Sequence, residues 1–231
     1  MSMNIVFILV EPSLPENIGA AARAINTMGF DSLWLVNPPN FPNEKSFHVA
    51  HGSHEILSKA IIFPDLAQAL LNVDFSIATS MKKRSVRQDY HHIDLLPEIL
   101  NSKKKSANTI ALVFGGEESG LSNEQVSLCD IISFIPLKQK YPSLNLSHAV
   151  MLYAFTLSPF STARKKKHIS APTGKYQKMV DLAEDIMKEV NFKKDSNIYP
   201  RIFERLALLG DDDVNLVLSF LDKLSKKLNA G

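Results

Sequence analysis

Short apolar runs and segments of helical periodicity alternate along the first 160 residues. The runs are rich in Ile, Val and Phe, and they lie at 4–10, 32–36, 74–78, 109–114 and 130–135. Between and after them, helical spacing is found at 17–29, 64–72, 93–101, 122–128 and 145–160. Because strands that alternate with helices commonly form parallel sheets, the pattern predicts an α/β fold with a mostly parallel sheet.

The first predicted helix, 17–29, is built from small residues. Its three consecutive alanines favour helix, and Gly29 is a suitable helix stop. Apolar residues at a spacing of three to four share one face, namely Ile18, Ala21, Ala22 and Ile25. We expect this face to let the helix lie close to the sheet.

The composition changes at 158–174, "SPFSTARKKKHISAPTG", which combines Pro, Ser and Thr with a basic run. Beyond it, helical periodicity returns at 175–190, 198–209 and 213–228. The sequence therefore predicts three parts: an α/β domain at 1–160, a basic linker at 161–174, and a small all-helical unit at 175–231.

Charge is unevenly spread along the 231 residues. The net charge is +2, with −2 over residues 1–160 and +4 over residues 161–231. Basic clusters occur at 82–87, 103–105 and 164–167. Such runs suit contact with phosphate, but solubilising surface charge is an equally good interpretation of any one of them.

Cysteine and hydropathy restrict the class of protein. The single cysteine, Cys129, excludes an internal disulfide framework and a cysteine-based metal cluster, and we predict no metal site. No uncharged apolar run reaches the roughly 20 residues of a membrane span. The simplest expectation is a cytoplasmic protein without a membrane partner.

Three junctions between a predicted strand and the following helix carry unusual residues. The first, "VEPSLPENIGAAARA" at 10–24, has two prolines, then Asn17 and Arg23. A guanidinium is a permanent cation whose planar fork suits phosphate or carboxylate. From this segment alone, Arg23 is equally well read as a surface residue of the helix.

The second junction is "LVFGGEESGLSNEQV" at 112–126. Gly115 and Gly116 let a ligand approach the backbone closely, and Glu117 and Glu118 follow them. The segment matches neither common phosphate-binding glycine motif, and adjacent acids make a poor phosphate cradle. A structural turn remains an alternative.

The third junction is "PLKQKYPSLNLSHAVMLYAF" at 136–155. It places Ser143, Asn145, Ser147 and His148 at the start of an apolar helix. Capping a helix needs only one Ser or Asn, so this cluster exceeds what capping requires. Ligands of α/β sheets bind at the carboxyl ends of strands, so the three junctions predict one shared site.

Taken together and in this order, "EPSLPENIGAAARAINTMGF", "ALVFGGEESGLSNEQV" and "FIPLKQKYPSLNLSHAVMLYAF" resemble the three motifs of the SPOUT methyltransferases. The resemblance is to the TrmJ/LasT branch of the TrmH-like RNA ribose methyltransferases, and it covers roughly residues 3–160. It implies a sheet whose C-terminal segment forms a trefoil knot, and a homodimer whose knotted regions face each other. The helical unit resembles that branch only in size and position.

The resemblance also implies S-adenosyl-L-methionine as cofactor, covered by the segment after the last strand. By position, the expected contacts are Thr79, Ser80, Met81, Gly115, Gly116, Ile135, Leu137, Pro142, Ser143 and Leu144.

The implied reaction is methyl transfer to a ribose 2′-hydroxyl of RNA, with tRNA the expected substrate and rRNA the alternative. The hydroxyl is a poor nucleophile, so it needs alignment and help in losing its proton. Arg23 matches the arginine to which the family assigns that task. The other residues expected to act in the site are Asn17, Glu117, Ser143 and Asn145.

The same resemblance gives the basic runs a function. Arg84 lies in the loop after the cofactor-binding "ATS" and is a candidate for RNA contact. The further candidates are Lys82, Lys83, Arg87, Arg164, Lys165 and Lys166.

One position departs from the family pattern. TrmJ-type sequences usually read Phe-Gly-Arg-Glu at the second motif, and this chain reads "FGGE" at 114–117. With glycine at 116, the site lacks the cation that an arginine would supply. The identity of the RNA substrate is therefore open, and so is the alternative of a knotted RNA-binding protein that has lost catalysis. Intact Arg23, Glu117 and "SLN" at 143–145 favour an enzyme.

Overall fold

The α/β part of the protein is built around one mostly buried sheet. The computed structural model describes residues 3–80, 89–138, 144–161, 174–194, 196 and 198–228. All pairings of the sheet are parallel, and the strand order is β3-β2-β1-β6-β4-β7-β5. The strands are β1 (Asn4–Val10), β2 (Leu33–Val36), β3 (Ile61–Phe63), β4 (Phe75–Thr79), β5 (Tyr90–His92), β6 (Thr109–Phe114) and β7 (Ile131–Phe134).

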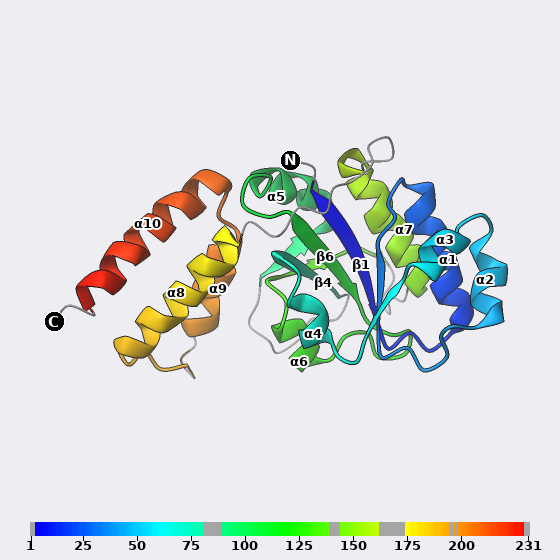
Figure 1. The fold of residues 1–231 in the computed structure, drawn as a ribbon, viewed down its shortest axis with the longest axis horizontal. Helices are drawn as coiled ribbons and strands as arrows, with labels where there is room; N and C mark the ends of the chain where they lie inside the picture. Colours follow the sequence, from blue (N-terminus) through cyan, green and yellow to red (C-terminus); the bar gives the residue numbers. More distant parts are fainter. Residues whose placement is uncertain are drawn as a thin grey trace.

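Helices cover both faces of this sheet (Figure 1). In the α/β part they are α1 (Pro15–Thr27), α2 (Glu44–Ala50), α3 (His54–Ser58), α4 (Leu66–Leu70), α5 (Leu96–Ser102), α6 (Asn123–Ser127) and α7 (Leu146–Leu157), with short 3-10 turns at Ile93–Leu95 and Ser158–Phe160. One core cluster joins the sheet to α1, α5 and α7, and a second joins it to α4 and α6. The predicted α/β fold with a parallel sheet is confirmed.

The central strands β1 and β6 are hydrophobic runs because both of their faces are covered. Every residue of β6 is buried, as is every residue of β1 after Asn4. The small face of α1 packs against this sheet, with Ile18, Ala21 and Ile25 fully buried. The predicted close approach of these small residues to the sheet stays a prediction.

Most predicted elements lie within a few residues of the observed ones, and four short elements were not predicted. The five predicted strands correspond to β1, β2, β4, β6 and β7. Strand β3 and strand β5 are three residues each and lie at the sheet edges, and α2 and α3 are similarly short. Helix α1 begins at Pro15 rather than at 17, as expected for a proline in the first turn.

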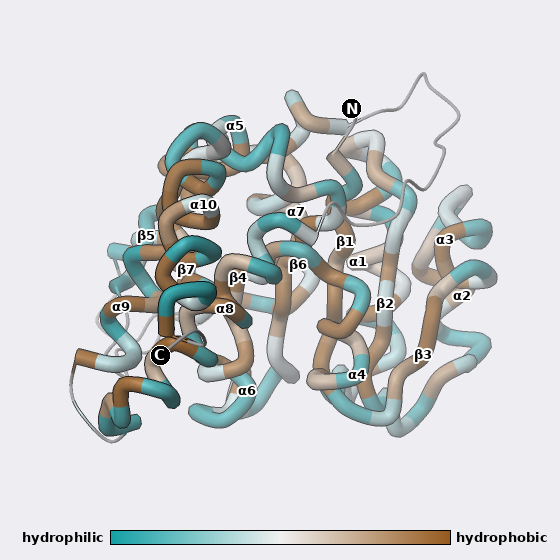
Figure 2. The backbone as a smooth tube through the Cα atoms, turned by 60° about the vertical axis from the view of Figure 1, so that its left-hand side comes forward, coloured by the Kyte–Doolittle hydropathy of each residue, from teal (hydrophilic) through white to brown (hydrophobic). Residues whose placement is uncertain are grey.

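Three further helices follow: α8 (Lys175–Glu189), α9 (Ile198–Ala207) and α10 (Asp211–Leu228). They lie together at one end of the molecule, and Figure 2 shows α10 alternating between hydrophobic and hydrophilic positions. The helical character predicted for this region is confirmed. The division into three parts with boundaries at 160 and 174 stays a prediction.

Tyr176 at the start of α8 joins these helices to the residues around the sheet. Its side chain is 2% exposed, and its ring packs edge-on against Phe75, with ring centres 5.7 Å apart. Its hydroxyl donates to Oδ1 of Asp130 at 2.8 Å, and Nζ of buried Lys103 lies 4.8 Å from the ring centre. Burial raises the pKa of Asp130, although hydrogen bonds from Ser76 and Tyr176 oppose that rise.

Among the described helices, none is long and apolar enough to cross a membrane. Residues 139–143, which follow the last predicted strand, lie outside the described residues, so the predicted knot stays a prediction.

Candidate functional site

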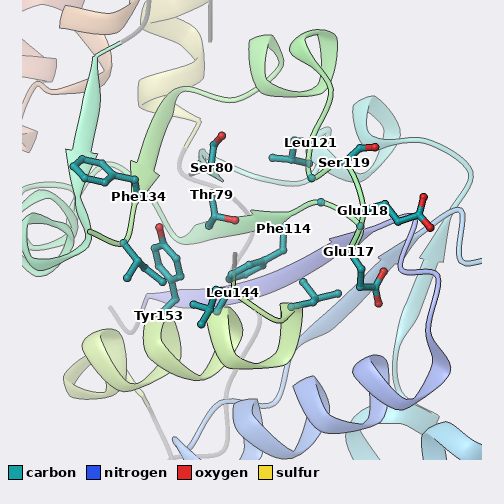
Figure 3. A pocket seen from close by; sticks show the side chains of 16 residues that line it. Thr79, Ser80, Phe114, Glu117, Glu118, Ser119, Leu121, Phe134, Leu144 and Tyr153 are labelled. Atoms are coloured by element: carbon teal, nitrogen blue, oxygen red, sulfur yellow. The ribbon is translucent and has the colours of Figure 1, made fainter. Parts of the chain in front are cut away.

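A pocket of about 170 Å³ opens at the carboxyl ends of β4, β6 and β7, against the start of α7 (Figure 3). It is lined by Thr79, Ser80, Phe114, Gly115, Gly116, Glu117, Glu118, Ser119, Gly120, Leu121, Phe134, Ile135, Leu144, Leu146, Ala149 and Tyr153. Parallel strands place their carboxyl ends at one edge of the sheet, which is the usual ligand site of such folds.

The strand ends are tied together around this pocket. Oγ1 of Thr79 donates to the carbonyl of Val113 at 3.0 Å, and the N–H of Ser80 donates to the carbonyl of Ser133 at 3.0 Å. Hydrogen bonds therefore hold the end of β4 to the neighbouring strands β6 and β7 at the pocket.

An aromatic pair forms one side of the pocket. Tyr153 of α7 and Phe114 at the end of β6 meet edge to face, with ring centres 5.5 Å apart, and Figure 3 shows both beside Leu144. The Tyr153 hydroxyl donates to Oγ of Ser133 at 3.1 Å, and burial raises the pKa of Tyr153. Tyr153 therefore remains neutral at physiological pH and serves as a packed, hydrogen-bonded wall.

The turn after β6 needs its glycines. The N–H of Gly120 donates to the carbonyl of Gly116 at 3.0 Å, closing a tight turn. A Cβ at Gly115 would overlap the backbone of Gly120 and Leu121, and a Cβ at Gly116 would lie 2.7 Å from the carbonyl oxygen of Glu11. Without a side chain, Gly115 can pack against Gly120 and Leu121 at the end of the turn, and Gly116 can pack against Glu11 after β1.

Glu117 links this turn to the N-terminus of α1. Its Oε2 accepts from the N–H and the hydroxyl of Ser13 at 2.9 and 2.8 Å. Its Oε1 accepts from Nδ2 of Asn17 at 2.7 Å and from the N–H of Leu14 at 3.3 Å. A carboxylate at a helix N-terminus satisfies backbone donors that have no partner inside the helix.

These contacts keep Glu117 ionised. Partial burial raises the pKa of the carboxyl, but the hydrogen bonds from Asn17 and Ser13 outweigh it, so the pKa lies below its usual value.

Asn17 extends the hydrogen bonds to the third junction. Its Oδ1 accepts from Nδ2 of Asn145 at 3.0 Å, and Oδ1 of Asn145 accepts from the N–H and the hydroxyl of Ser147 at 2.8 and 2.7 Å. Asn145 is thereby the N-cap of α7. We call this chain of contacts, from Ser13 through Glu117, Asn17 and Asn145 to Ser147, the Glu117 relay.

The structure thus brings the three junctions together, as predicted. Of the expected cofactor contacts, Thr79, Ser80, Gly115, Gly116, Ile135 and Leu144 line the pocket. Leu137 does not line it and packs instead, partly buried, against the core cluster of the sheet. Met81, Pro142 and Ser143 lie outside the described residues, and the binding roles of all these residues stay predictions.

Arg23 is not among the lining residues. It is exposed on α1, six residues after Asn17, which places it about 120° around the helix from that residue. The expected RNA contacts Lys82, Lys83, Arg84, Arg87, Arg164, Lys165 and Lys166 lie outside the described residues.

Several lining residues were not predicted. Ala149 and Tyr153 follow Asn145 at intervals of four, so the helical period could have placed them on the pocket side of α7. Phe114 and Phe134 are the last residues of their strands and could have been found by the same strand-end argument. Ser13 lies in the first junction, but nothing in the sequence pointed to its contact with Glu117.

A larger cavity of about 450 Å³ lies between α6 and the helices α8 and α9. It sits away from the carboxyl ends of the strands, and its Asp130 is already bonded to Ser76 and Tyr176. In the described ranges, no group of His, Cys, Asp or Glu side chains could hold a metal ion.

The fold and this pocket define an α/β protein with a ligand site at the strand ends. Residues 4–155 match the family model of the SpoU rRNA Methylase family, and the chain belongs to that family. It is an RNA methyltransferase with the SPOUT fold, which confirms the resemblance of its three motifs.

Named relatives agree with this assignment. The chain is 35% identical over 230 residues to the "Uncharacterized tRNA/rRNA methyltransferase LasT" of Escherichia coli K12, covering 98% of this chain and 99% of that protein. It is 37% identical over 156 residues to the tRNA (cytidine/uridine-2'-O-)-methyltransferase TrmJ of the same strain, covering 67% and 63%. The crystal structure of TrmJ from Z. mobilis ZM4 superposes with a TM-score of 0.67 at 27% identity, covering 95% and 98%.

Proposed function

We propose that the protein transfers a methyl group from S-adenosyl-L-methionine to a ribose 2′-hydroxyl of tRNA. The single observation that carries the proposal is that the second and third motif segments line one pocket, and that the first is hydrogen-bonded to both of them through the Glu117 relay. The name of the TrmJ relative, a tRNA 2′-O-methyltransferase, supports the ribose and the tRNA.

The pocket suits the methyl donor in the chemistry of its lining. The tight turn at 116–120 and the strand ends at 134–135 offer backbone groups for a purine edge, beside the apolar wall of Phe114 and Tyr153. The residues expected to hold the donor are Thr79, Ser80, Gly115, Ile135 and Leu144. When bound, the donor supplies an electrophilic methyl group.

The chain's own residues align the acceptor. Glu117 and Asn145 fix Asn17 from both sides, so the first and third junctions keep one relative position. Arg23, exposed on α1, is the permanent cation expected to engage the target phosphate and to help the hydroxyl lose its proton. Since it lies outside the pocket, it would act on RNA that covers the rim.

A homodimer is part of the proposal. Apolar side chains stand exposed on α7 and at the start of α1, with Leu14, Leu152 and Phe155 exposed by 51%, 39% and 64%. Burying these side chains against a second copy would remove them from water. Four further expectations remain proposals. They are the trefoil knot after β7, the domain boundaries at 160 and 174, RNA contact by the basic runs, and a cytoplasmic location.

The test is a transfer assay with methyl-labelled donor and either unmodified bulk tRNA or rRNA, followed by digestion to nucleosides. We expect a labelled 2′-O-methylnucleoside from tRNA. Label on a base, or transfer to neither RNA by protein that binds the donor, would refute the proposal.

Two other outcomes have specific support. The matching family is described by rRNA methylation, so label confined to rRNA would identify that RNA as the substrate. Gly116, which stands where TrmJ-type sequences usually carry arginine, favours a knotted RNA-binding protein without catalysis. Donor binding and RNA binding without transfer would identify that function.

A further inference from the structure

The Glu117 relay has a direction that the chemistry of its members fixes. An ionised carboxylate only accepts hydrogen bonds, so Asn17 must turn its Nδ2 toward Glu117 and its Oδ1 toward Asn145. Asn145 must then present Nδ2 to Asn17 and Oδ1 to Ser147. Each amide therefore has one orientation that satisfies both of its neighbours.

Both ends of this relay are serines. At one end, Ser13 gives Oε2 of Glu117 two of the four hydrogen bonds that the carboxylate accepts, one from its N–H and one from its hydroxyl. At the other end, Ser147 gives Oδ1 of Asn145 both an N–H and a hydroxyl. The two hydroxyls close the relay, and neither serine lines the pocket.

We propose that Ser13 and Ser147 are positioning residues for methyl transfer, acting through Glu117 and Asn145 respectively. The inference rests on the proposed function and adds to it two residues that touch no reacting atom. Their hydroxyls bind the two terminal members of the relay, so that Asn17 of α1 keeps one orientation toward Asn145 of α7 and the two motif segments keep one separation.

The two serines should differ in effect. Ser13 donates to a charged oxygen, and hydrogen bonds to charged groups are the stronger kind. Its loss also leaves Glu117 fewer partners. The Ser147 hydroxyl donates to Oδ1 of Asn145, which is a neutral amide oxygen. Without that hydroxyl, Oδ1 still accepts from the N–H of Ser147, so the hydroxyl should contribute less to kcat.

The experiment compares Ser13→Ala and Ser147→Ala with Ser13→Thr and Ser147→Thr, which restore the hydroxyl. Ser122→Ala is the matched control, because Ser122 caps α6 through its hydroxyl but belongs neither to the relay nor to the pocket lining. We expect kcat to fall about 10-fold or more for Ser13→Ala and about 3- to 10-fold for Ser147→Ala.

In both alanine variants, the affinity for S-adenosyl-L-methionine should stay within about twofold of the wild type, since the lining is unchanged. The threonine variants should recover most of kcat. Alanine variants that match Ser122→Ala in kcat, or that lose kcat and donor affinity in parallel without threonine rescue, would overturn the proposal.

A second readout separates this inference from the proposed function. Side-chain amide signals of Asn17 and Asn145 in NMR spectra of the donor-free protein should be slowed in hydrogen exchange, and each alanine variant should speed that exchange. If the wild type methylates no RNA, the proposed function falls, and the exchange data still show whether the serines hold the relay. Exchange that no alanine variant alters would overturn the positioning role.

Discussion

Replacing Gly116 by arginine, the residue usual at this place in TrmJ-type sequences, should damage this protein rather than improve it. A Cβ at position 116 would lie 2.7 Å from the carbonyl oxygen of Glu11, a separation that requires one backbone to move. Glu11 has little freedom to do so, because its N–H donates to the carbonyl of Val36 at 2.8 Å and its φ is already +51°. The steric conflict begins at Cβ, so alanine should show it as well.

The magnitude follows from this geometry. Forcing extra atoms into a packed site costs about 1–3 kcal/mol. In a chain of this size, each kcal/mol lowers the melting temperature by about 2–4 °C, so the expected loss is about 2–12 °C. Because the turn at 116–120 lines the pocket, affinity for S-adenosyl-L-methionine should fall in parallel.

Thermal unfolding followed by circular dichroism measures this effect in Gly116→Ala and Gly116→Arg. Gly210→Ala is the matched control, since its Cβ would meet Ser102 Cβ at 3.5 Å, an ordinary contact. A Gly116→Ala melting temperature equal to that of Gly210→Ala would show that the carbonyl of Glu11 leaves room for a side chain at 116. So would a Gly116→Arg variant that is both stable and more active.

Four further predictions concern other parts of the molecule. Arg23→Ala should leave donor affinity nearly intact while turnover falls about 100-fold or more, and an equal loss of both in titration and rate assays would contradict the catalytic role. Tyr176→Phe should lower unfolding free energy by about 1–3 kcal/mol in urea titrations, because it removes the buried hydrogen bond to Asp130; an unchanged midpoint would show that the ring alone anchors α8. The low pKa of Glu117 adds stability that is complete above about pH 4.5 and is lost as pH falls through the lower folded-state pKa. Melting curves of the wild type and Glu117→Gln should therefore converge in acid, and a constant difference between pH 7 and 3 would contradict this. Deleting residues 161–231 should weaken RNA binding and reduce its salt dependence in filter-binding assays, whereas an unchanged slope would leave those residues a structural role.

The parts of the fold that could be predicted are those whose hydrophobic pattern is set by burial on both faces. β1 and β6 are long runs of Ile, Val and Leu, and their buried positions match the pattern closely. β3 and β5 could not be found in this way. They are short edge strands, and "IIF" is largely exposed while "YHH" carries no apolar alternation. The strand order, which pairs β1 with β6 and β4 with β7, depends on contacts distant in sequence.

The sequence could predict that the three segments form the candidate site, but it could not predict which of their side chains are in contact. Strand ends identify the three junctions, whereas the bond between Asn17 and Asn145 joins residues 128 positions apart and depends on the strand order. The same limit explains Arg23. Its residue type suggested the chemistry, but Arg23 is exposed on α1, and no residue of α1 lines the pocket.

The methyl donor is proposed to bind in the pocket at the carboxyl ends of β4, β6 and β7. The most direct measurement is calorimetric titration of the wild type with S-adenosyl-L-methionine, beside Ala149→Phe, which places a ring in the pocket, and Ala207→Ser, which alters a buried alanine on α9 outside the pocket lining. We expect one donor bound per chain by the wild type and by Ala207→Ser, and at least tenfold weaker binding by a folded Ala149→Phe variant. Equal donor affinity in all three proteins, or no binding by the wild type, would contradict it.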